Sequence, residues 1–350
     1  MKRHFNVLTL LCCLHSVVAL ACAQQDTGST SAAKASGTVL TIGDLTWPDI
    51  DALSRDRTLF ILTVGMLEEH GPHLPIASDT IAVEYEARAV ADRLGHALPG
   101  WSVVMMPAVN YGSAGANQIG NVAIHPGTYG IRQSTLRSLV ADIGGQIVQN
   151  RFKWVFVMNG HGAPTQHVAL NEACDFVSEV FHATMLNVSG LFNADAAIQA
   201  QGEKLAAKHF SPADLASFGR DVHAGVRETS GMLAIRPDLV RPSYRGLPSY
   251  RAENLGERRD IARRPDWPGY FSSPARASGA YGRAIEEWWV DGITDLILRA
   301  VRGENLLGRP RWPGPLQNDP AYAQVVDGIL EPEREFELKF ERWLSERKKK

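Results

Sequence analysis

Apolar and polar positions along this chain follow two periods, one typical of buried strands and one typical of helices. Short runs rich in β-branched and aromatic residues predict strands at 59–65, 101–109, 153–159 and 183–189. Apolar residues at three- and four-residue spacing predict helices at 80–95, 134–151, 167–182, 196–210 and 285–303. This alternation of strands and helices predicts an α/β fold, in which helices cover both faces of a mostly parallel sheet.

The segment 241–280 breaks the pattern, because it is rich in Arg, Pro, Gly and Ser and lacks a clear period. We expect irregular structure there. The sequence contains no internal repeat and no sign of a second core. We therefore expect one folded domain over residues 39–310 and a C-terminal extension over 311–350, which ends in a basic run of solvated charge.

The first 23 residues have the pattern of an export signal. The basic region MKRHFN precedes the apolar run VLTLLCCLHSVVAL, and Ala21-Cys22-Ala23 fits the small-residue site at which signal peptides are cleaved. We expect an exported protein, periplasmic or secreted, with a flexible linker at 24–38 and no membrane span after cleavage. Two alternatives stay open, an uncleaved anchor and a lipoprotein attached through Cys22.

Charge and cysteine content argue against a nucleic-acid-binding protein and against an internal disulfide. The chain has 36 Lys and Arg against 38 Asp and Glu, so it has no basic excess for binding nucleic acid. Three of the four cysteines lie in the signal segment, so cleavage after Ala23 would leave Cys174 alone in the mature protein. Because a single cysteine cannot form an internal disulfide, we expect Cys174 to pack in the core.

Ionisable residues gather where two of the predicted strands end. The stretch EEHGPHLPIASD (68–79) follows the first strand, and NGHG (159–162) ends the third. In open α/β sheets, ligand sites lie beyond the carboxyl ends of strands. Glu68 and His70 point to the same side of an extended chain, while Asp79 can face the site or cap the next helix. Such a mixed set of nitrogen and oxygen donors is typical of zinc, manganese or iron sites.

Two further histidines can complete such a site. His161 stands between glycines, where a structural histidine is at least as common as a ligand. His223 and Glu228 are five residues apart, so they converge if His223 lies in a loop and Glu228 in the first turn of a helix. The alternative is a surface loop with solvated charges. Read from the residues alone, the chain is an α/β protein with a metal site.

Taken in order, these stretches resemble the creatininase (creatinine amidohydrolase) family. The family's Glu-x-His-Gly-x-His-Leu-Pro loop with a following Asp, its Asn-Gly-His-Gly turn and its His-Ala-Gly-x-x-Glu-Thr-Ser stretch are matched at 68–75 with Asp79, at 159–162 and at 223–230. The resemblance spans roughly residues 40–300. It implies a three-layer α/β/α sandwich with a mostly parallel sheet, in which residues 39–310 form a metal-dependent hydrolase domain.

The resemblance also implies a site and a reaction. Two divalent metal ions per subunit (Zn, Mn or Fe) are expected, and the family ligands match Glu68, His70, Asp79 and His161, with Asp79 as the bridge. His223 matches a histidine implicated in proton transfer. Glu228 matches a glutamate near the metals, which makes it a candidate both for catalysis and for metal binding. We expect a homo-oligomer, such as the hexamer that members often form, and a metal-bound hydroxide that hydrolyses the C–N bond of a small amide, cyclic amides included.

Two departures from the family bear on the substrate. Creatininase has a glutamate two residues after the histidine of its turn, where this chain has Ala163. It also holds creatinine with tryptophans in a region where this chain has none, between Trp154 and Trp267. We therefore expect a substrate other than creatinine. The alternative is that Trp267, Tyr270 or Phe271 replaces the missing tryptophans as a substitute wall. The alternative function is an exported, non-catalytic metal- or ligand-binding protein on the same fold.

Overall fold

The computed structural model describes residues 37–122, 125–316 and 318–348. The predicted signal peptide at 1–23, and all but the last two residues of the predicted linker at 24–38, lie outside the described residues. Among the helices that are described, none is both long enough and apolar enough to cross a membrane.

A five-stranded parallel sheet forms the middle of the fold, with the strand order β1-β3-β2-β4-β5. The strands are β1 (Thr38–Thr41), β2 (Thr58–Val64), β3 (Ser102–Met105), β4 (Trp154–Asn159) and β5 (Thr184–Asn187). Every residue of β2 is buried, which explains why its sequence is mostly apolar and does not alternate. Four of these strands were predicted, and β1 was not.

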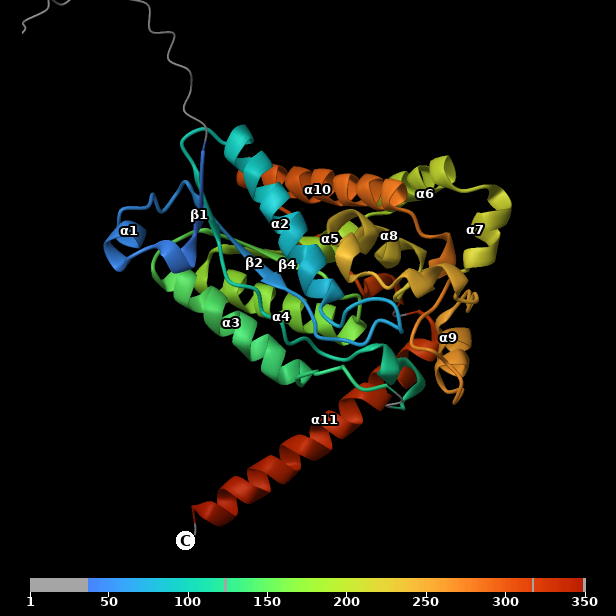
Figure 1. The fold of residues 1–350 in the computed structure, drawn as a ribbon. Coiled ribbons are helices and arrows are strands. Elements are labelled where there is room, and N and C mark those ends of the chain that lie inside the picture. Colours follow the sequence, from blue (N-terminus) through green and yellow to red (C-terminus); the bar gives the residue numbers. More distant parts are fainter. Residues whose placement is uncertain (1–36, 123–124, 317, 349–350) are drawn as a thin grey trace, which may run out of the picture. The chain divides into compact units, whose positions relative to one another are not determined.

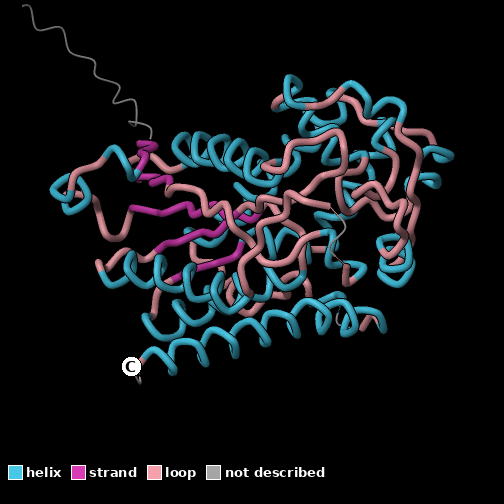
Figure 2. The backbone as a smooth tube through the Cα atoms, turned by 60° about the horizontal axis from the view of Figure 1, so that its bottom comes forward, coloured by secondary structure: helices cyan, strands magenta, loops and turns pink. Residues whose placement is uncertain are grey.

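Helices cover both faces of the sheet, as Figures 1 and 2 show. In β2, Leu59 and Ile61 pack against α2, α5 and α10, whereas Phe60 and Leu62 pack against α3 and α4. The buried Cys174 belongs to the second of these cores. The bounds are α2 (Ser78–Ala97), α3 (Gln133–Gln149), α4 (Pro164–Phe181), α5 (Val188–Ala194) and α10 (Gly279–Val301). The predicted three-layer α/β/α sandwich is confirmed.

The remaining helices lie around this sandwich. They are α1 (Trp47–Asp51), α6 (Ala196–His209), α7 (Pro212–Phe218), α8 (Val226–Ile235), α9 (Leu255–Ala262) and α11 (Pro320–Arg347). The expectation of irregular structure at 241–280 is wrong for α9. That helix begins where the Asn254 side chain accepts a hydrogen bond from the Glu257 amide, and it buries Leu255 and Ala262. Its charged sequence has too few apolar positions to show a period.

The strand order places a ligand site between β2 and β4. From β2 the chain moves outward to β3 on one side, and it then returns to β4 on the other side of β2. The sheet therefore has a switch point between β2 and β4, the place where open α/β sheets bind ligands. Val64 and Asn159, the last residues of these strands, are register partners. The two segments that follow them start side by side.

Candidate metal centre

The segments after β2 and β4 approach each other closely because of one glycine. The Gly160 amide donates a hydrogen bond to the Val64 carbonyl at 2.9 Å. A Cβ at Gly160 would lie 2.3 Å from the backbone oxygen of Asp79, so any larger residue would push the turn away from α2. The glycine thereby allows His161, the next residue, to reach the first turn of α2.

Asp79 lies at the middle of the cluster. Its Oδ1 is 3.2 Å from His70 Nε2, and its Oδ2 is 3.0 Å from His161 Nδ1. Although Asp79 is in the first turn of α2, the N-cap residue of that helix is Ala77, which makes no side-chain cap. Of the two alternatives for Asp79, the structure shows a side chain that faces the site.

Two groups of three candidate ligands share Asp79. Glu68 Oε2 is 3.0 Å from His161 Nδ1, and these two residues form the first group with Asp79. Glu228 Oε2 is 3.6 Å from His70 Nε2, and this pair forms the second group with Asp79. Within each group, one ligand atom from every residue lies within 4.8 Å of the others. All five side chains are buried except Glu228, which is partly buried.

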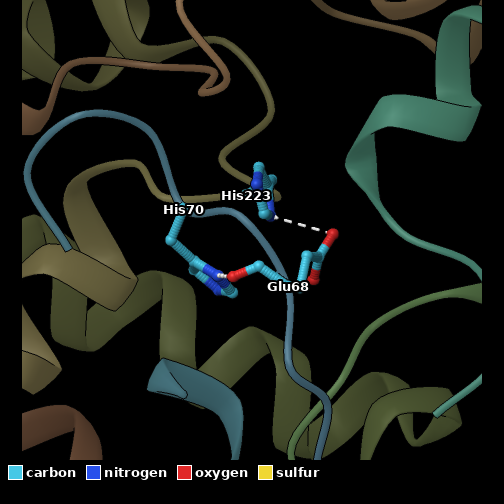
Figure 3. Close-up of side chains that lie close together, drawn as sticks. All are labelled: Glu68, His70 and His223. Carbon is cyan, nitrogen blue, oxygen red and sulfur yellow. Dashed lines mark hydrogen bonds and ion pairs between the residues drawn. The ribbon is translucent and has the colours of Figure 1, made fainter. Parts of the chain in front are cut away.

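His223 forms a third candidate group with Glu68 and His70, and Figure 3 draws these three side chains. Its Nδ1 is 3.7 Å from Glu68 Oε1, and its Nε2 is 3.7 Å from Glu69 Oε1. The Nδ1 atom of His70 lies 3.0 Å from the backbone oxygen of Glu68. That contact orients His70 Nε2 toward Asp79. The structure thus brings all six predicted site residues into one cluster.

The buried charges of the cluster stabilise one another. Burial acts to raise the pKa values of Glu68 and Asp79, but the neighbouring histidines outweigh it and hold both below their usual range. Burial likewise acts to lower the pKa of His161, and Glu68 and Asp79 raise it to about 10. The carboxylates are therefore ionised, with the histidines as their counter-charges.

The donor set fits divalent metal ions. His161 Nε2 is buried and has no hydrogen-bond partner in the described part of the chain. Unpaired buried polar atoms cost free energy, and metal coordination would offset that cost. Carboxylate oxygens and imidazole nitrogens are donors that zinc, manganese and iron accept.

A cavity of about 110 Å³ opens onto the candidate ligands. Glu68, Asp79, His161, His223 and Glu228 line one side of it. Much of the remaining lining is apolar and comes from α9, α11 and the segment between α10 and α11, including Leu255, Arg258, Trp312, Leu316, Val325 and Ile329. The sequence motifs missed this part of the lining, because its residues come from segments that carry no recognisable motif.

A second cavity, of about 90 Å³, touches the cluster from another side. Its lining also includes Asp79, His161 and Glu228, and it adds two facing glutamates, Glu86 on α2 and Glu286 on α10. The expected aromatic wall is wrong for both cavities. Trp267, Tyr270 and Phe271 are fully buried in the core, and none of them is among the residues that line these two cavities.

Comparison with known proteins matches most of this chain to one family. The family model described as "Creatininase: Creatinine amidohydrolase" matches residues 43–297. The creatinine amidohydrolase of Pseudomonas putida is 29% identical over 276 residues, which cover 73% of this chain and 95% of that protein. The mycofactocin precursor peptide peptidase of Mycobacterium ulcerans (strain Agy99) is 29% identical over 272 residues, which cover 74% of this chain and 88% of that protein.

Solved structures agree with the family match. A crystal structure of creatinine amidohydrolase (creatininase) aligns with a TM-score of 0.54 and 26% identity, covering 75% of this chain and 98% of its own. Two further creatininase structures with the same coverage are described as a Zn–Zn type and as an Mn form.

Proposed function

Because this chain belongs to the creatininase family, a family of hydrolases, we propose that it is a metal-dependent amidohydrolase that cleaves the C–N bond of a small amide. The observation that carries this proposal is the pair of ligand groups sharing Asp79 at the edge of a cavity, with His223 beside them. The names of the relatives add support, since a creatinine amidohydrolase and a peptide peptidase both hydrolyse C–N bonds.

The residues divide into two sets of metal ligands. Glu68 and His161 would hold one ion, His70 and Glu228 the other, and Asp79 would contact both. Zinc and manganese are the first ions to test, because creatininase structures are described in Zn–Zn and Mn forms. When bound, divalent ions polarise a substrate carbonyl and lower the pKa of water from 15.7 to roughly 7.

His223 supplies the proton that the leaving nitrogen needs. Its ring lines the cavity next to the candidate ligands, 4.5 Å from the ring of His70 between centroids. Burial and the neighbouring His70 act to lower the pKa of His223, whereas Glu68 and Glu69 raise it above its usual value. Glu69 Oε1, 3.7 Å from Nε2, keeps the ring facing the cavity.

The substrate we propose is an amide other than creatinine. Ala163 lines the cavity with a methyl group, so it adds no further carboxylate to the ligands. The aromatic residue in the wall is Trp312, which follows α10 and lies far along the chain from the region where creatininase carries its tryptophans. A differently built wall favours a differently shaped substrate.

A panel assay tests this function. The purified protein is stripped with a chelator, reloaded with Zn²⁺, Mn²⁺ or Fe²⁺, and offered small amides, lactams and N-acyl amino acids. We expect release of amine that depends on metal. The variant His223→Gln should lower kcat by about 10²- to 10⁴-fold while metal content stays unchanged, because the proton donor is lost and the ligands remain.

The exposed His96→Gln on α2 is the matched control and should behave like the parent. Metal-loaded protein that turns over none of the panel would favour a non-catalytic binding protein. Loss of metal in His223→Gln would show that His223 is a ligand and would contradict its proposed role in proton transfer.

A further inference from the structure

We propose that the cavity beside the metal centre accepts amides that carry a carboxylate, and that Arg258 binds this carboxylate. The inference deepens the proposed function, on which it rests, by naming a substrate class. It starts from a charged side chain, Arg258, that lines the same cavity as the candidate metal ligands.

Arg258 is buried without a direct partner. It lies in α9 with 5% of its surface exposed, and its Nε is fully buried with no hydrogen-bond partner in the described part of the chain. Among the described residues, no carboxylate forms a side-chain hydrogen bond with its guanidinium. A buried charge without a paired counter-ion is costly, so such residues are rarely kept without a ligand or partner.

The surroundings of Arg258 leave its charge only partly balanced. Burial and repulsion from Arg220 lower the pKa of Arg258 to about 10, so the guanidinium is still charged at neutral pH. Asp319 attracts it, but the Asp319 side chain caps α11 by accepting a hydrogen bond from the Ala321 amide at 2.8 Å. The acidic residues in the cavity lining are engaged with histidines of the metal centre.

The chemistry of the cavity defines the substrate. A guanidinium binds a carboxylate through two parallel hydrogen bonds, which is a geometry that few other ligand groups match. Leu255, Leu316, Val325 and Ile329 make much of the remaining lining apolar. An amide with an apolar body and one carboxylate fits both features, and N-acylated amino acids with aliphatic side chains form the simplest such class.

Two matched probes and two protein forms test the proposal. N-Acetyl-leucine and N-isopentylacetamide differ by the carboxylate alone, and each is given to the metal-loaded parent and to Arg258→Met. In the parent we expect kcat/KM to be about 10- to 100-fold higher for N-acetyl-leucine, the range expected for a hydrogen-bonded charged group. Arg258→Met should lose this preference, because the partner of the carboxylate is removed while the candidate metal ligands remain.

The neighbouring Arg259→Met removes a charge from the same helix at a residue outside the cavity lining, where Arg259 contacts Gln324. It should retain the parent's preference. Arg258→Lys keeps the positive charge but lacks the two parallel donors of a guanidinium. It should retain only part of the preference for N-acetyl-leucine. Thermal unfolding checks that each variant folds, and Arg258→Gln replaces Arg258→Met if the latter does not fold.

Calorimetric titration of N-acetyl-leucine separates this inference from the proposed function. If no amide is hydrolysed with any metal, the proposed function fails, while tighter binding to the parent than to Arg258→Met still supports the carboxylate site. Equal kcat/KM for the two probes in the parent overturns the proposal. The same holds if Arg258→Met keeps the preference or the affinity, as it would if the carboxylate bound only the metals.

Discussion

Among single residues, Glu228 should determine how many metals the centre holds. It lies in the first turn of α8, where its Oε2 accepts a hydrogen bond from the Ala224 amide at 2.6 Å and lies 3.6 Å from His70 Nε2. Ala163 provides no alternative carboxylate. Glu228→Gln keeps the size but removes the charge, so we expect elemental analysis after dialysis to find about one metal per chain, against two in the parent.

The size of the effect distinguishes a ligand from a supporting residue. Loss of an indirect partner typically weakens metal binding about 10- to 100-fold, and loss of a direct carboxylate ligand should weaken it more. The exposed Glu203→Gln on α6 is the control and should keep the parent's metal content. If Glu228→Gln also keeps two metals, another donor completes the second set.

At the scale of elements, the contact between the end of β4 and the start of α2 sets the geometry of the centre. Gly160→Ala would place a Cβ 2.3 Å from the Asp79 carbonyl and 3.0 Å from the Val83 side chain. We expect it to lower the free energy of unfolding by about 1–3 kcal/mol, as overpacked sites do, and to weaken metal binding. Chemical denaturation and metal titration measure the two effects.

Gly162→Ala is the matched control two residues later in the same turn. A Cβ there would meet no atom within 4 Å, so both stability and metal binding should stay near the parent values. Equal losses in the two variants would mean that the turn needs glycine flexibility rather than close approach.

The packing of α2 against α10 should make stability depend on pH. Burial and the facing Glu286 raise the pKa of Glu86, and burial raises the pKa of Glu286 to about 7. Both native pKa values exceed the unfolded value near 4.5, so the native state binds more protons in this window. The protonated glutamates therefore stabilise the native state at low pH. This contribution to the free energy of unfolding is lost as the pH rises from about 4.5 to 7.

Glu286→Gln should remove part of this loss. Between pH 5 and pH 7.5, we expect the unfolding free energy of the variant to fall by about 1–3 kcal/mol less than that of the parent. Urea unfolding at the two pH values measures this difference. Glu287→Gln, the exposed neighbour that pairs with Arg93, should follow the parent. The explanation fails if all three proteins lose stability equally over this range.

At the scale of the whole molecule, α11 contributes wall residues to the cavity that the candidate metal ligands line, although it lies far from them in the sequence. Val325 and Ile329 are buried at the cavity wall, whereas the later part of α11 extends away from the sheet (Figure 1) and leaves Leu338 60% exposed. Ile329→Ala should cost about 2 kcal/mol, the lower end for a buried aliphatic residue, and raise KM with metal content unchanged. Leu338→Ala should change stability by less than about 0.5 kcal/mol. A normal KM in Ile329→Ala would remove α11 from the substrate wall.

The sequence by itself determined the fold class and, to within one residue, where β2 and β4 end. Periodicity reports which side of a segment is buried, and a fully apolar run such as 59–65 requires cover on both faces. The sequence also determined which segments carry the candidate metal ligands, because strand ends and glycine-rich turns can be recognised from local sequence. Glu68, His70 and Asp79 follow one strand, and His161 follows another, so their convergence could be predicted.

Only the tertiary structure decided what surrounds these ligands. The direction of Asp79 and the approach of Glu228 to His70 depend on helices that are joined by long connections, which no local pattern encodes. The same is true of Arg258, whose burial follows from the packing of α9 and α11 rather than from its charged sequence. Trp267 illustrates the converse: an aromatic residue fits a substrate wall or a core equally well, and its neighbours in space placed it in the core.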